Sequence, residues 1–229
     1  AHGQDYEISG RTFNEAGKKI GPARIVVYDS NKKRIAELET PASGKFKLKN
    51  IPDGKYIINF YGPDGYGITE NVTVSGADKK DVNPQMNPNP DQVQLKIKPT
   101  SEGSSLTWRA ISGAANYIIY RDNKEITTTN QTSYLDEVEP GETYGYNVIV
   151  IKNDQSMGTR SITEYGKALM QPPENIEAEA KKNNVKLTWF PVEDATGYNV
   201  YRDGEKVNST ADNSYTDFNL KYETEYSYS

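Results

Sequence analysis

The sequence contains no cysteine and a single histidine, His2, and each absence removes a class of chemistry. Without cysteine the chain can form no disulfide, no thiolate nucleophile and no cysteine-ligated metal site. A Ser-His-Asp triad needs a histidine held inside a site, whereas His2 lies at a chain end, where structure commonly frays. We therefore expect no catalytic residue, no metal site and no cofactor.

Long apolar runs and an excess of positive charge are also missing. No run of about 18 apolar residues occurs, so the sequence predicts no membrane-spanning helix. The formal net charge of -5 and the pI of about 5.1 disfavour a nucleic-acid partner, whose phosphates would require a basic face. Only 34% of the residues are hydrophobic, but 17 tyrosines, 18 glycines and 12 prolines recur at short intervals. This composition is typical of small all-β domains with many turns.

Residues 6–82 consist of short alternating segments separated by turn residues. In "GKFKLKNI", Phe46 and Leu48 alternate with lysines, which predicts a strand with one buried and one wet face. The order "ISGRTFNEAGKKIGPARIVVYD", "TPASGKFKLKNIPDGKYIINF" and "GYGITENVTV" resembles the carboxypeptidase regulatory-like domain. That resemblance implies a transthyretin-like sandwich. The next stretch, "NPQMNPNPD" at residues 83–91, predicts an extended linker with freely rotating asparagines.

The remaining sequence contains a repeat. "LTWRAISGAANYIIYRD" begins at Leu106 and "LTWFPVEDATGYNVYRD" begins at Leu187. With "PGETYGYNV", these motifs resemble the fibronectin type III domain, in the variant common in secreted and surface proteins of prokaryotes. The resemblance implies that Trp108 and Trp189 are core residues between two sheets. It also implies that Tyr144 and Tyr226 occupy the tyrosine corner and belong to the structural core.

We therefore predict an all-β protein of three tandem β-sandwich domains, with a transthyretin-like domain followed by two immunoglobulin-like fibronectin type III domains. The predicted domains span residues 1–86, 87–170 and 171–229. Pro172 and Pro173 restrict the backbone between the second and third predicted domains. We therefore expect residues 83–91 to be more flexible than that connection.

The second copy of the repeat stops earlier than the first. Tyr226 aligns with Tyr144, so Ser229 matches Asn147, and the first copy continues to Met170. The missing residues hold the rest of one long strand and a final strand, whose absence would leave backbone groups unpaired. We therefore expect the third domain to be C-terminally incomplete and the chain to be a fragment.

The favoured function is a non-catalytic, extracellular or cell-surface modular region that spaces, orients or supports a neighbouring domain. The alternative is a glycan- or cell-surface-binding module. Its candidate contacts are Tyr61 and Tyr66 in "YGPDGYG", where tyrosines at a glycine-rich turn could stack on sugar rings. The expected partners are adjacent domains of the same chain and, in the alternative, polysaccharide or a cell surface, without nucleic acid or membrane insertion.

Overall fold

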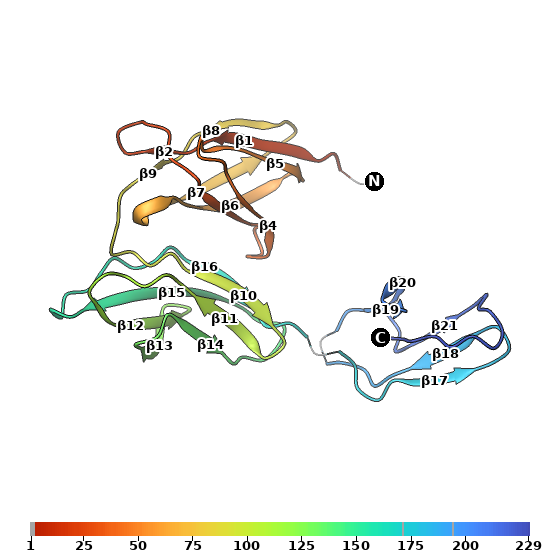
Figure 1. The fold of residues 1–229 in the computed structure, drawn as a ribbon. Coiled ribbons are helices and arrows are strands. Elements are labelled where there is room, and N and C mark those ends of the chain that lie inside the picture. The colour runs from red at the N-terminus through yellow and green to blue at the C-terminus, as the bar shows by residue number, and fades with distance from the viewer. Residues whose placement is uncertain (1–2, 171, 194) are drawn as a thin grey trace. The chain divides into compact units, whose positions relative to one another are not determined.

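The computed structural model describes residues 3–170, 172–193 and 195–229, and these form an almost entirely β protein. The chain divides into two compact units, Ala1–Ala168 and Leu169–Ser229, and each is described by itself. Figure 1 shows the strands of both units. Within the described residues, no helix is long and apolar enough to cross a membrane.

The N-terminal part of the first unit is a sandwich of two antiparallel-rich sheets, in the orders β5-β1-β8 and β4-β3-β6-β7 (Figure 1). A short 3-10 turn, η1 (Pro63–Gly65), follows β6. Alternation in β5 turns Phe46 and Leu48 inward, as the sequence predicts, and the core includes Ile8, Ile58 and Phe60. The strands are β1 (Tyr6–Arg11), β2 (Phe13–Asn14), β3 (Arg24–Tyr28), β4 (Arg34–Glu39), β5 (Lys45–Ile51), β6 (Gly54–Tyr61), β7 (Gly67–Val74), β8 (Lys79–Val82) and β9 (Gln85–Met86).

Residues 83–91 are not a free linker, which corrects the expectation from their composition. Strand β9 lies inside this stretch and pairs in parallel with β2. Met86 is fully buried in the core of the first sandwich, and the backbone N–H of Gly67 donates to the carbonyl of Asn87. The burial of Met86 and the backbone hydrogen bonds therefore hold this stretch against the first sandwich, although its asparagines and prolines predicted a flexible backbone.

The second part of the first unit is another sandwich, with sheets in the orders β10-β11-β14 and β13-β12-β15-β16. Its core contains Leu95, Leu106 and Trp108 from one sheet with Tyr117 and Val148 from the other. The strands are β10 (Lys96–Thr100), β11 (Gly103–Thr107), β12 (Ala114–Arg121), β13 (Lys124–Thr129), β14 (Ser133–Asp136), β15 (Thr143–Lys152) and β16 (Glu164–Lys167).

The second unit repeats this pattern with sheets β17-β18-β21 and β19-β20. Leu187, Trp189 and Val200 form its buried core. The backbone of Ser229 exchanges two hydrogen bonds with that of Tyr201, at N···O distances of 2.9 and 3.1 Å. The strands are β17 (Glu177–Ala180), β18 (Val185–Thr188), β19 (Tyr198–Arg202), β20 (Glu205–Thr210) and β21 (Ser214–Asp217).

The two copies of the repeat share side-chain contacts as well as residue types. Trp108 meets Tyr117 edge-to-face with ring centroids 5.3 Å apart, and Trp189 meets Tyr198 at the same distance. Each of these tyrosine hydroxyls accepts a backbone N–H at 2.9 Å, from Ile111 in the first copy and from its counterpart Val192 in the second. A sequence pattern that reproduces individual hydrogen bonds in both units supports the alignment of the two copies.

Candidate functional site

The two sandwiches of the first unit meet through a small apolar cluster outside their separate cores. Val26, Tyr28 and Tyr61 are its buried members, and they come from β3 and β6 of the first sandwich. Ile162 and Tyr165, from the end of the second sandwich, pack against them. The rings of Tyr28 and Tyr165 meet edge-on, with centroids 5.0 Å apart. We call this contact, with the polar groups described next, the junction.

A buried carboxylate lies at the centre of the junction. Glu164, the first residue of β16, is only 1% exposed. The hydroxyls of Tyr28 and Tyr61 donate one hydrogen bond each to its two oxygens, and Nδ2 of Asn59 donates a third at 3.2 Å. Nδ2 of Asn59 also donates to the carbonyl of Thr163 at 2.8 Å. Three donors from one sandwich therefore converge on a single acidic group of the other.

The protonation states follow from burial. Burial raises the pKa of Glu164, and the hydrogen bonds from the two tyrosines and the charge of Arg24 oppose that rise without cancelling it. Burial, followed by the charge of Glu164, raises the pKa of Tyr28 and of Tyr61. Both phenols therefore remain protonated and can act as donors. The arrangement is a closed polar network, because each buried group has a partner in the opposite sandwich.

Cationic and amide side chains extend the junction along residues 94–97, at the start of β10. The guanidinium of Arg24 donates to the carbonyl of Leu95 at 2.9 Å and lies 4.2 Å from the centre of the Tyr61 ring. Arg34 donates to the carbonyl of Ile97 at 2.9 Å. Nε2 of Gln94 donates back to the carbonyl of Gly62 at 2.8 Å. These bonds run in both directions between the sandwiches and fix their register as well as their separation.

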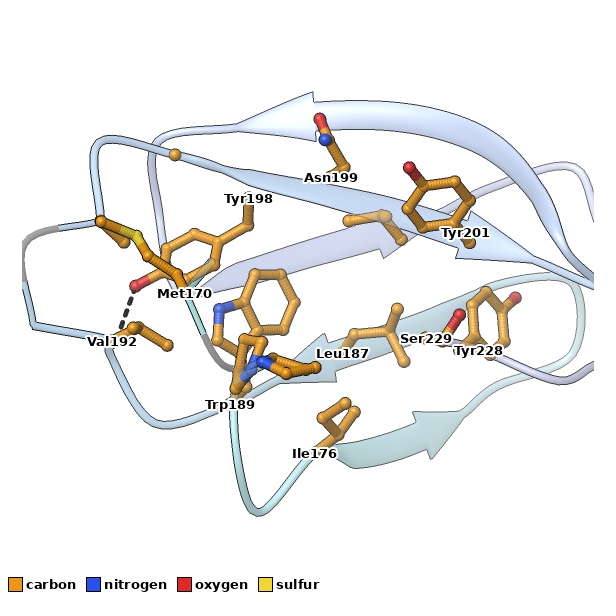
Figure 2. A pocket seen from close by; sticks show the side chains of 15 residues that line it. Met170, Ile176, Leu187, Trp189, Val192, Tyr198, Asn199, Tyr201, Tyr228 and Ser229 are labelled. Carbon is orange, nitrogen blue, oxygen red and sulfur yellow. Dashed lines mark hydrogen bonds between the residues drawn. The ribbon is translucent and has the colours of Figure 1, made fainter. Parts of the chain in front are cut away.

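A groove of about 470 Å³ lies beside Trp189 in the second unit (Figure 2). Figure 2 shows Leu187, Trp189 and Tyr198 around it, with Tyr228 at one end. In the first unit the counterparts of Leu187, Trp189 and Tyr198 are core residues that cluster with the fully buried Val148 and Val150 of β15. Among the described residues, the lining is therefore mainly apolar and includes core-forming positions of the repeat, with Asn199, Tyr201 and Ser229 as polar members.

The structure separates the two tyrosines that were candidate glycan contacts. Tyr61 is only 3% exposed because it ends β6 within the junction, so its ring cannot stack on a sugar, and the expectation of an exposed ring is corrected. Tyr66 is half-buried, packs against the first core and donates to a carboxylate oxygen of Glu15 at 3.4 Å. These two residues therefore do not form one aromatic platform.

The four predicted structural residues are placed as follows. Trp108 and Trp189 are each 6% exposed and belong to separate cores. The hydroxyl of Tyr226 accepts the backbone N–H of Lys221 at 3.0 Å, which is the bond expected of a tyrosine corner. Tyr144 is half-buried beside Tyr146, with ring centroids 6.4 Å apart.

The candidates for acid–base or metal chemistry remain few. His2 lies outside the described residues. Within the described residues, no group of three or more histidine, cysteine or acidic side chains could hold a metal ion.

Glu164 is the residue that the sequence patterns did not single out. One available signal was strand β3, "RIVVY", in which Val26 and Tyr28 are as buried as the core-facing Ile25 and Val27. A strand that is apolar on both faces is covered on both faces. That pattern predicts a covering element for this sheet, but it does not identify which residue of the partner completes the contact.

One family model matches the first sandwich. Residues 10–88 match the family model SpaA, a prealbumin-like fold domain. Serine-aspartate repeat-containing protein E of Staphylococcus aureus, in strains USA300 and Newman, is 39% identical to the chain over 70 residues. The match covers 31% of this chain and 6% of the length of that protein.

Two solved structures are similar over more of the chain. One is BcpA, the major pilin subunit of Bacillus cereus, at 10% identity and a TM-score of 0.34, covering 96% of this chain and 86% of that one. The other contains the fibronectin(III)-like modules of CbhA from Clostridium thermocellum, at 14% identity and a TM-score of 0.27, covering 73% and 95%. The strands described above make this an all-β chain of sandwich domains, and residues 10–88 are similar to a prealbumin-like domain.

Proposed function

We propose that the chain is a non-catalytic, extracellular or cell-surface modular region that spaces and orients neighbouring domains. The observation that carries this proposal is the junction of the first unit, where Glu164 accepts hydrogen bonds from three side chains of the preceding sandwich. A spacer transmits an orientation only where successive modules are fixed to one another. A buried network has that effect, because every polar group in it loses its partner if the sandwiches separate.

We further propose three domains, at residues 1–86, 87–170 and 171–229, in keeping with three separate apolar cores. The first is assigned as carboxypeptidase regulatory-like and the other two as fibronectin type III by their sequence resemblances. In this division the first two domains act as one rigid element, because the junction lies between them. The partners of such an element would be the adjacent domains of the same chain, whose relative orientation it would set.

The test is a distance measurement across the junction in the full chain. Because the sequence has no cysteine, Lys49→Cys and Lys124→Cys introduce two spin-label sites and no others, both at exposed positions and one in each sandwich of the first unit. Pulsed electron paramagnetic resonance is expected to give one narrow distribution of the distance between the two spin labels. Glu164→Ala in the same background leaves three buried donors without an acceptor, so the distribution should broaden.

Glu142→Ala is the matched control, since it removes an exposed carboxylate from the same sandwich. It should leave the distribution narrow, and circular dichroism should show that both variants retain their β-structure. A broad distribution in the parent protein, or an unchanged one in a folded Glu164→Ala variant, would refute the proposed orienting role.

A further inference from the structure

The outer face of the sheet β5-β1-β8 carries a line of positive charge. Alternation in β5 turns Phe46 into the core, so Lys45 and Lys47 project outward. On the neighbouring strand Ile8 is buried, and Arg11 pairs directly opposite Lys45 in the register. Like charges that face each other across two strands repel, so this arrangement weakens the sheet unless an anion lies between them.

Arg11 lacks the ion pair that most of the arginines in the described part of the chain form. Among the residues that the structure describes, no ion pair involves Arg11, Lys45 or Lys47. The ion pairs of the described residues join Arg24 and Arg34 to Glu37, Arg121 to Asp136, Lys152 to Asp91 and Arg202 to Asp217. Arg11 and its neighbours therefore keep their donors for a group from outside the chain.

The cations line a shallow groove of about 600 Å³ that also holds hydrogen-bonding groups of other kinds. Asp81, which also lines it, offers a carboxylate acceptor. Asn83 uses its oxygen to accept the backbone N–H of Arg11 at 3.1 Å, which leaves its amide N–H groups for a ligand. Ser9 adds a hydroxyl, and the ring of Phe13 adds an apolar surface.

We propose that this groove binds a linear acidic polysaccharide. The cations suit its carboxylates, Asp81 and Asn83 suit its hydroxyls, and the Phe13 ring suits the apolar face of a sugar. Lys45 and Lys47 are two residues apart on a strand, about 6.6 Å, so they can meet charges that recur along a chain. A phosphate polymer without hydroxyls would bring no hydrogen-bond donor for the Asp81 carboxylate, whereas a polysaccharide brings several. This inference does not depend on the junction, and the two proposals can fail separately.

The experiment titrates the full chain with three probes of similar length: oligogalacturonate, a neutral cello-oligosaccharide and inorganic polyphosphate. Oligogalacturonate is expected to bind saturably and more weakly as salt rises, because exposed charges are screened. The neutral oligosaccharide should bind much more weakly. Lys45→Glu and Lys47→Glu should each weaken oligogalacturonate binding about tenfold, the loss of one charge-assisted hydrogen bond.

Lys55→Glu is the matched control, because it makes the same charge change at an exposed position of the same sandwich, on a strand of the other sheet. It should leave the affinity within about twofold of the parent. Equal losses in all three variants would reduce the effect to net charge and overturn the site. Absence of saturable oligogalacturonate binding would also overturn it. Polyphosphate binding as tight as oligogalacturonate binding would overturn the assignment to a polysaccharide.

Discussion

The phenol hydroxyl of Tyr28 donates a hydrogen bond to the carboxylate of Glu164, which lies 136 residues further along the chain. The same phenol oxygen accepts the backbone N–H of Tyr165 at 3.2 Å, so one side chain of β3 binds two successive residues of β16. In the described part of the chain, Glu164 forms no ion pair within 4 Å. Neutral donors, rather than a direct cation, therefore hold this buried acid.

We predict that the junction makes stability depend on pH through Glu164. Burial raises the pKa of Glu164 in the folded protein above its ordinary value of 4.5. The folded state thus binds this proton more tightly than the unfolded chain does. The stabilisation is fully present below about pH 4.5 and is lost as the pH rises through the raised pKa. The free energy of unfolding of the parent, minus that of Glu164→Gln, should therefore fall as the pH rises through this window.

Urea denaturation at a series of pH values measures this difference. Glu142→Gln, at an exposed position of the same sandwich, controls for the loss of one negative charge. A difference that stays flat would mean that the hydrogen bonds from the tyrosines balance burial, and one that rises with pH would mean that they outweigh it; either outcome contradicts the prediction.

The repeated core could be predicted from the sequence because its chemistry is local. Trp108 and Trp189 occupy the same position in the two copies of the repeated motif. The alternation of apolar and polar residues around them predicts that both side chains point into the core. Both are found in their expected cores, each beside the tyrosine nine residues later. Every second side chain of a strand points to the same face, so the buried face can be predicted from residues that are close in the sequence.

The junction could not be predicted in the same way because it is a property of pairing between distant segments. Glu164 looks like any exposed acid at a strand start, and Tyr61 looks like a turn residue. Only the fold brings both to one point. Composition was also misleading at residues 83–91, where the burial of Met86 outweighs the flexibility that asparagine suggests. The sequence shows that Arg11 and Lys45 are charged, but only the strand register shows that they lie directly opposite each other.

We predict that Trp108→Ala and Trp189→Ala are each severely destabilising. Each removes a large ring between two sheets, which typically costs about 3 to 5 kcal/mol. The indole N–H of each has no hydrogen-bond partner in the structure, so the loss should come from packing alone. Hydrogen exchange of the full chain, followed by mass spectrometry, should show each loss of protection confined to the sandwich that carries the substitution. Protection near the parental level in either variant would contradict the core assignment.

We predict that Asp136→Ala costs more stability than Asp217→Ala, although the two residues make matching contacts. Asp136 accepts from Tyr146 at 2.5 Å and from Arg121 at 2.7 Å. Tyr146 is fully buried, so its orphaned hydroxyl cannot reach water, which costs about 1 to 3 kcal/mol.

In the second copy, the hydroxyl that donates to Asp217 at 2.9 Å belongs to Tyr228, which is only half-buried. Water can replace the lost acceptor there, so the penalty is smaller. Thermal unfolding of each unit, followed by hydrogen exchange, measures both variants in the same chain. Equal losses, or a larger loss for Asp217→Ala, would show that burial of the tyrosine does not set the cost.

Finally, we predict that Gly10→Ala disrupts the edge of the first sandwich while Gly3→Ala does not. A Cβ atom on Gly10 would lie 1.8 Å from the carbonyl oxygen of Val82, far inside contact distance. Gly10 pairs with Val82 in the parallel register of β1 and β8, so the backbone of β8 would have to move away. Hydrogen exchange should then show lost protection in β8, together with a fall in the melting temperature of the unit. A Cβ on Gly3 meets no atom within 4 Å, so that variant should match the parent protein. Full protection of β8 in Gly10→Ala would mean that the two strands pack less closely than the structure shows.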